Sequence, residues 1–155
     1  MNAKMRMTND TISRFAEAMN QMLSRDMSAF FERRIYPMYQ QAQKNRWMTE
    51  NVSEGTQWRE LNPSYVKYKK TKYAAYPGKG TKKIIATGKL VSVATGESSG
   101  LNKIITPKQF RVAIDLGKVP YAKHVASEFP IMEFGPNTKS KMKKAIAAYI
   151  KGKAK

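Results

Sequence analysis

An apolar anchor followed by a proline is the feature that most restricts how this chain can fold. Trp58 and Leu61 lie three residues apart, so both side chains can cover one side of a turn. Pro63 then removes a backbone donor and favours an extended conformation at Asn62, so we expect the turn to end there. A second reversal is expected at Thr87-Gly88, held against a core by apolar neighbours on both sides, Ile84, Ile85 and Leu90.

These segments read Gly-x-x-Trp-x-x-Leu-x-Pro-x-Tyr over residues 55–65 and Ile-Ile-x-Thr-Gly-x-Leu over residues 84–90. The pair resembles the virion morphogenesis or tail completion proteins of tailed bacteriophages, which act at the neck, where head meets tail. Tyr121-Ala122-Lys123-His124 looks like the Tyr-Ala-x-x-His element of that family, and Phe134-Gly135-Pro136 precedes a final helix. Family members place an apolar-Gly pair soon after the His, whereas residues 125–133 intervene here.

The resemblance, which covers residues 50–150, implies a non-enzymatic structural protein of a phage virion. It would act in tail completion or head-tail joining at the neck, within an oligomeric ring. The implied partners are further copies of the chain, other neck or tail proteins such as connector, adaptor and tail terminator proteins, and genomic DNA through non-specific contact. No cofactor or membrane is implied, and the protein is expected in the virion after assembly in the host cytoplasm. The residues expected to maintain the fold are Gly55, Trp58, Leu61, Pro63, Thr87, Gly88, Leu90, Tyr121, Ala122, His124 and Gly135.

The charge balance restricts the partners. There are 29 Lys and Arg residues against 11 Asp and Glu, a formal charge of +18. Such an excess attracts nucleic acid through counterion release, and it also steers docking onto an acidic protein surface. We predict an exposed basic loop over residues 66–83 that contacts DNA or an acidic partner through Lys67, Lys69, Lys70, Lys72, Lys79, Lys82 and Lys83. A second basic group closes the chain: Lys139, Lys141, Lys143, Lys144, Lys151, Lys153 and Lys155.

Tyrosines interleave with the lysines of the predicted loop, at Tyr65, Tyr68, Tyr73 and Tyr76. Aromatic side chains among lysines can stack on bases while the ammonium groups meet phosphate. A solvated insertion whose tyrosines pack locally explains the same pattern, and we favour it over sequence-specific binding. Non-specific contact with DNA remains open, so a basic nucleic-acid-binding protein is the alternative function.

Length and composition favour one domain with a single core in 155 residues. The chain contains no Cys, which excludes a disulfide scaffold and suits a reducing cytoplasm. No apolar run approaches the roughly 20 residues that a membrane span needs. We predict a flexible N-terminus over residues 1–9, a single α+β domain over residues 10–151 and a flexible tail over residues 152–155.

The expected fold class is α+β, a small antiparallel β-sheet packed with a long N-terminal helix and a C-terminal helix. Apolar residues recur at three and four from Asp10 to Tyr36, and Pro37 should kink or end this first helix. Past Phe30 the apolar residues drift around the helix. A second contact surface is therefore implied, either with another part of the same core or with an adjacent protomer, through Phe31, Ile35 and Met38.

A hairpin is predicted around Pro107-Lys108, because residues 109–116 alternate apolar and polar side chains after an arm over residues 103–106. Residues 119–125 are predicted to form another strand. The stretch after Leu90 fits either a short helix or a strand.

Two further helices are expected. The family resemblance favours a helix that begins near Thr87. Apolar residues return at helical spacing from Thr138 to Ile150, with Asn137 or Thr138 as the cap.

Catalysis has few candidate groups. His124 is the only imidazole in the chain, and a lone His beside a strand is more often a structural hydrogen-bonding group than a base. The carboxylates show neither metal-ligand spacing nor a paired motif. The sequence therefore predicts a protein that is not an enzyme, and a small hydrolase or nuclease acting through His124 and Glu128 is the weakest of the three hypotheses.

Overall fold

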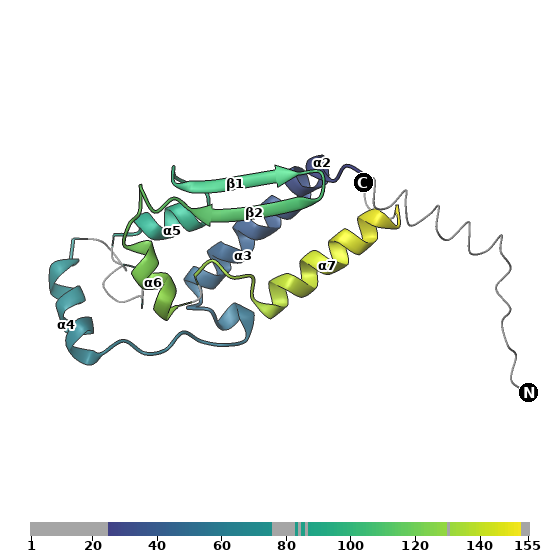
Figure 1. Ribbon diagram of the computed structural model, residues 1–155. Helices are drawn as coiled ribbons and strands as arrows, with labels where there is room; N and C mark the ends of the chain where they lie inside the picture. Colours follow the sequence, from purple (N-terminus) through teal and green to yellow (C-terminus); the bar gives the residue numbers. More distant parts are fainter. Residues whose placement is uncertain (1–24, 76–82, 84, 86, 130, 153–155) are drawn as a thin grey trace, which may run out of the picture.

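The computed structural model describes residues 25–75, 83, 85, 87–129 and 131–152 (Figure 1). The predicted flexible N-terminus, the first part of the predicted N-terminal helix and residues 153–155 of the predicted tail lie outside them. The described elements, in chain order, are α2 (Ser28–Phe30), η1 (Phe31–Ile35), α3 (Tyr36–Met48), η2 (Val52–Glu54), α4 (Pro63–Lys72), α5 (Lys89–Ala94), β1 (Leu101–Thr106), β2 (Gln109–Ile114), α6 (Ala122–Glu128) and α7 (Pro136–Ile150).

The architecture is α+β, as predicted. β1 and β2 form an antiparallel hairpin whose register pairs Leu101 with Ile114 and Thr106 with Gln109. The predicted hairpin is thus confirmed. Its second strand ends at Ile114, two residues earlier than predicted. The hairpin lies over a long helix built from α2, η1 and α3, and α7 runs beside that helix (Figure 1).

The long helix passes through Pro37 without ending there, so of the two predicted effects of Pro37, a kink or an end, the end is wrong. η1 is a π-helical turn, in which the N–H of Tyr36 bonds to the carbonyl of Phe31, five residues back. Pro37 then occupies the first turn of α3, and the helix continues to Met48. The π turn resets the hydrogen-bonding register immediately before Pro37, and the helix thereby accommodates a residue that has no N–H to donate.

The predicted helix is also wrong over residues 25–27, which are not helical, and the described part of the long helix begins at Ser28. The predicted start at Asp10 lies outside the described residues. Asp26 Oδ1 accepts a hydrogen bond from the Ser28 N–H at 2.8 Å. The N–H of Met27 is donated to the carbonyl of Pro107 on the hairpin turn at 2.9 Å. An Asp side chain that bonds a backbone two residues on competes with helix, and here it sets the helix start.

Among the described residues, the core consists of two clusters of buried side chains. The first contains Trp47 and Trp58 with residues of α5 and α6, and the second lies between the long helix, the hairpin and α7. Phe31 and Ile35 belong to the second cluster, so they cover another part of the same core, which was one of the two possibilities for that surface. Phe30 stacks on Tyr149 of α7 with ring centroids 4.2 Å apart.

Residues 119–125 form a turn and the start of α6, so the predicted strand is wrong. The N–H of Val119 bonds to the Asp115 carbonyl at 2.9 Å, and that of Ala122 bonds to the Val119 carbonyl at 3.0 Å. These are local turn bonds. Val119, Ala122 and Val125 recur every three residues and all pack on the first cluster, which is helical spacing and not strand alternation.

α7 begins two residues earlier than predicted, and its cap comes from a distant part of the chain. Neither Asn137 nor Thr138 precedes the helix, because Pro136 occupies its first turn after Gly135. Glu54, only 5% exposed, accepts hydrogen bonds from the Thr138 N–H at 3.1 Å and from the Thr138 hydroxyl. A carboxylate therefore stabilises the positive end of the helix dipole.

Candidate functional site

Three of the motif segments, residues 55–65, 84–90 and 121–124, meet in the first core cluster. Residues 56–62 run as an extended strap between η2 and α4 (Figure 1). The ring of Trp58 on this strap is 4% exposed and packs edge-on against Trp47, with centroids 5.2 Å apart, and against Phe129. Leu90 and Ala122 belong to the same cluster, and partly buried Leu61 packs on it, as does Ile85. The expectation that Trp58 is a buried anchor is confirmed.

Pro63 begins a helix where it was predicted to end a turn. It occupies the first turn of α4, and the Asn62 side chain accepts a hydrogen bond from the Ser64 N–H at 2.9 Å. Asn62 is extended, with φ −54° and ψ 131°, as expected for a residue before proline. Pro is favoured at the first helical position and Asn at the cap, so the Asn-Pro pair was a helix start signal.

Two of the three motif glycines set backbone reversals. Gly88 has φ +84° and Gly55 φ +91°, both in the left-handed region that favours glycine. The reversal at Thr87-Gly88 is confirmed, and α5 follows directly at Lys89, as the resemblance favoured. Gly135 has φ −67°, so its conformation suits any residue, but a Cβ at that position would overlap the Glu54 carboxylate.

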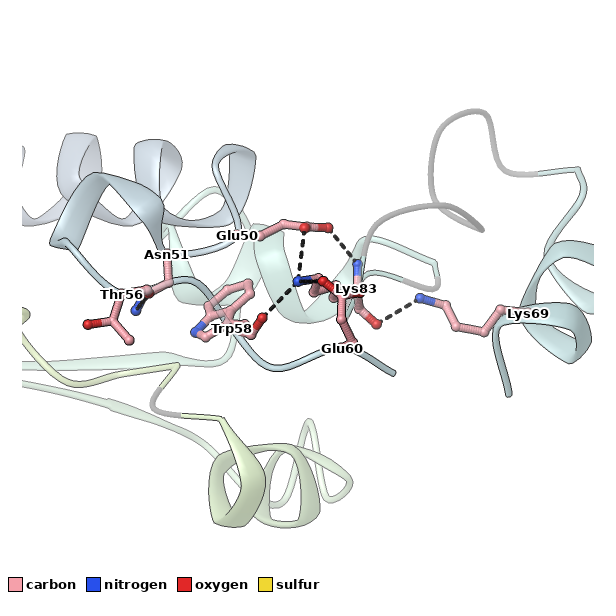
Figure 2. Close-up of polar contacts among 7 residues, drawn as sticks. All are labelled: Glu50, Asn51, Thr56, Trp58, Glu60, Lys69 and Lys83. Carbon is pink, nitrogen blue, oxygen red and sulfur yellow. Dashed lines mark hydrogen bonds and ion pairs between the residues drawn. The ribbon is translucent and has the colours of Figure 1, made fainter. Parts of the chain in front are cut away.

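The prediction of an exposed basic loop over residues 66–83 is wrong in two respects. Residues 66–72 belong to helix α4, and two of the predicted contact lysines are buried. Lys69 is 1% exposed and Lys83 7%. Lys83 Nζ donates to the Trp58 carbonyl at 2.7 Å and lies 2.5 Å from Glu60 Oε1 and 3.7 Å from Glu50 Oε2 (Figure 2). These partners come from the strap and from the end of the long helix, so Lys83 fastens the two together.

A second set of bonds extends this clamp to α4. The backbone N–H of Lys83 donates to Glu50 Oε1 at 2.9 Å, and its carbonyl accepts from Lys69 Nζ at 3.0 Å (Figure 2). Burial lowers the pKa of the Lys69 ammonium, and the nearby Glu50 carboxylate opposes this effect. Both lysines therefore hold the fold together and cannot serve a polyanion on the surface.

Three of the predicted contact lysines lie exposed on α4, at Lys67, Lys70 and Lys72, whereas Lys79 and Lys82 lie outside the described residues. Tyr65 and Tyr68 are each nearly half exposed and stack on one another with centroids 6.0 Å apart. The ammonium of Lys72 sits 5.2 Å from the centroid of Tyr68. The tyrosines of α4 thus pack locally, as favoured, while Tyr76 lies outside the described residues.

Adjacent lysines on α4 provide a direct test of the clamp. We expect Lys69→Ala to lower the free energy of unfolding by about 2 kcal/mol, because the buried Lys83 carbonyl loses its donor. Lys70→Ala, which removes an exposed ammonium of the same kind, should change it by less than about 0.5 kcal/mol. Urea denaturation of both variants measures the difference, and equal effects would contradict the structural role of Lys69.

A cleft separates α4 from α6. It has a volume of about 550 Å³ and adjoins a second hollow of about 420 Å³, and both are lined in part by Tyr65, His124 and Val125. Glu128 forms an ion pair with Arg59 of the strap. In the described part of the chain, no hydrogen bond links Glu128 to His124, so the hydrolase hypothesis gains no acid-base pair from this cleft.

The remaining predicted positions lie near this cleft. Tyr121 is 41% exposed, precedes α6 and lines the smaller hollow together with Thr87 and Gly88.

No group of three His, Asp or Glu side chains suited to a metal ion occurs within the described ranges. Among those same residues, no helix combines the length and apolarity that crossing a membrane requires.

Comparison with known proteins adds no relative. No family model, curated protein or solved structure matches the chain.

Proposed function

We propose that this protein is a non-enzymatic structural component of a tailed-phage virion, which acts in tail completion or head-tail joining at the neck as part of an oligomeric ring. The observation that carries the proposal is the convergence of three of the motif segments in one structural unit. Trp58 of the strap, Leu90 of α5 and Ala122 of α6 pack in a single cluster.

The hairpin supports self-association. In the described residues β1 and β2 pair only with one another, so each strand has one edge that is not paired with another strand. Open edges of this kind accept strands from other chains. Ile104 and Leu116 are about half exposed on and beside this hairpin, and their burial would favour contact with a second copy.

Loss of the protein from a phage tests the proposal. We expect a phage whose reading frame for this chain carries a nonsense codon to accumulate filled heads beside separate tails, because the joint between them is incomplete. Electron microscopy of lysates on a suppressing and a non-suppressing host provides the measurement and its control. Intact virions on the non-suppressing host would reject the neck assignment and favour a basic nucleic-acid-binding protein.

The alternative function, non-specific nucleic-acid binding, is favoured by the way in which the carboxylates are used. Glu50 and Glu60 lie beside Lys83, and buried Glu54 caps α7. Glu32, Glu97 and Glu128 pair with Lys103, Lys44 and Arg59. These carboxylates are engaged within the chain, several of them in ion pairs at the surface, so they leave the excess of lysine and arginine without counter-charges.

A further inference from the structure

α7 turns a face made almost entirely of lysine and small residues toward solvent. Thr138 and Met142 are buried, and Ala145, Ile146 and Tyr149 pack against the second cluster, so this stripe faces the body of the protein. The lysines occupy the opposite side and are all exposed: Lys139, Lys141, Lys143, Lys144 and Lys151. Ser140 and Ala147, also exposed, lie between them. At 3.6 residues per turn, the lysines cover an arc of about 200°.

Nothing within the described residues neutralises this face. α7 contains no Asp or Glu, and none of its lysines forms an ion pair there. Lys139 and Lys143 are one turn apart, a spacing at which like charges destabilise a helix. Lys139 also lies in the first turn, where the helix dipole disfavours a positive charge. The stability of the helix therefore gives no reason for the placement of Lys139 and Lys143.

We propose that the outward face of α7 binds the phosphate backbone of duplex DNA without reading its sequence. The helix is about 22 Å long, and duplex DNA carries one phosphate charge per about 1.7 Å of its axis. Small residues between the lysines let a phosphate backbone approach closely. A lysine array on both flanks of a helix can reach the phosphates on either side of one groove, whereas a flat acidic protein surface would meet only part of the arc.

The composition of the face selects the form of the nucleic acid. Binding of single strands uses aromatic side chains as stacking platforms, and the one aromatic residue of α7, Tyr149, is stacked inside on Phe30. Base edges are read by Arg or Lys at guanine and by Asn or Gln at adenine, whereas α7 contains neither Arg nor Gln, and lysine binds phosphate as a point charge. The side-chain N–H of Asn137 already donates a hydrogen bond to the Ser53 carbonyl at 2.9 Å. Contact with duplex phosphate, independent of sequence, is what this face offers.

Two triple variants of the full chain with the same change in net charge test the proposal. One carries Lys139→Gln, Lys143→Gln and Lys144→Gln on α7, and the other carries Lys67→Gln, Lys70→Gln and Lys72→Gln on α4. Fluorescence anisotropy measures binding of a labelled duplex oligonucleotide of arbitrary sequence at several salt concentrations. We expect the α7 variant to reduce the slope of log affinity against log salt by up to about 2.7, since each phosphate contact contributes about 0.9. The α4 variant should keep the slope of the original protein.

Several results would overturn the proposal. An unchanged slope in the α7 variant, or equal reductions in both variants, would show that α7 is not the DNA-binding face. Stronger binding of a single-stranded oligonucleotide than of the duplex would also contradict it. Polyglutamate could displace the labelled duplex as well as unlabelled duplex of equal charge does, and the α7 variant could fail to bind polyglutamate. That pair of results would assign the face to an acidic protein partner. Circular dichroism checks that both variants are folded.

This inference does not depend on the proposed virion function. The anisotropy experiment uses purified protein, whereas the lysate experiment uses the phage. Separate tails with an unchanged salt slope would support the neck assignment and reject DNA binding by α7. Intact virions with a reduced slope would do the reverse.

Discussion

Trp58→Ala is expected to lower the free energy of unfolding by about 3–5 kcal/mol, the range for truncation of a large buried aromatic side chain. Trp58 packs edge-on against both Trp47 and Phe129, so its removal leaves a cavity between the strap, the long helix and the end of α6. Because the strap carries Trp58 between η2 and α4, we also expect the loss to loosen the attachment of α4. Urea denaturation followed by circular dichroism measures the change.

Trp58→Phe is the matched control. Trp58 Nε1 is buried without a hydrogen-bond partner among the described residues, so replacement of the indole by a benzyl group loses contact area but no hydrogen bond. We expect this variant to cost about 1–2 kcal/mol, clearly less than alanine. A loss below about 1 kcal/mol for Trp58→Ala would show that the side chain is not an anchor of the core.

Glu54→Ala is expected to have the second largest effect, a loss of about 3 kcal/mol. The carboxylate caps α7 through Thr138 and is almost fully buried. Its charge also acts on the nearby guanidinium of Arg46, whose pKa is lowered by burial and raised by Glu54. Removing Glu54 therefore leaves the helix start without an acceptor, and it takes from buried Arg46 one of two nearby carboxylates, the other being Glu133. Thermal unfolding of purified protein measures the loss.

Two control variants separate these effects from a general loss of negative charge. Glu54→Gln keeps the shape and one acceptor oxygen, so we expect an intermediate loss. Glu60→Ala removes a carboxylate of which 81% is exposed, so its pairing with Lys83 is screened and the loss should stay below about 1 kcal/mol. If Glu54→Ala is no more harmful than Glu60→Ala, the cap on α7 contributes little to stability.

Local patterns predicted the elements whose partners lie nearby in the chain. Alternation in residues 109–116 identified the hairpin, and helical spacing identified α7. The burial of Trp58 followed from its place in an apolar anchor before a proline. In each of these cases the hydrophobic period and the turn residues agree, so the sequence alone was sufficient.

The buried lysines show what local patterns cannot provide. Lys69 and Lys83 look like any other residue of a basic segment, and their burial depends on acceptors from Glu50 and Trp58, which the chain brings in from elsewhere. No periodicity signals such a partner. By contrast, Asn62-Pro63 is a local signal for the start of α4. Residues 119–125 likewise carry helical spacing, although a strand is predicted there from the sequence.

The fit between Gly135 and Glu54 predicts how related sequences can vary. Any side chain at position 135 would occupy the space of the Glu54 carboxylate, and a shorter residue at position 54 would open that space. The two positions are far apart in the chain, yet neither can change freely on its own. In natural variants, alanine or serine at position 135 should therefore occur together with a small residue at position 54. Such covariation in related sequences would reflect the contact between the two positions.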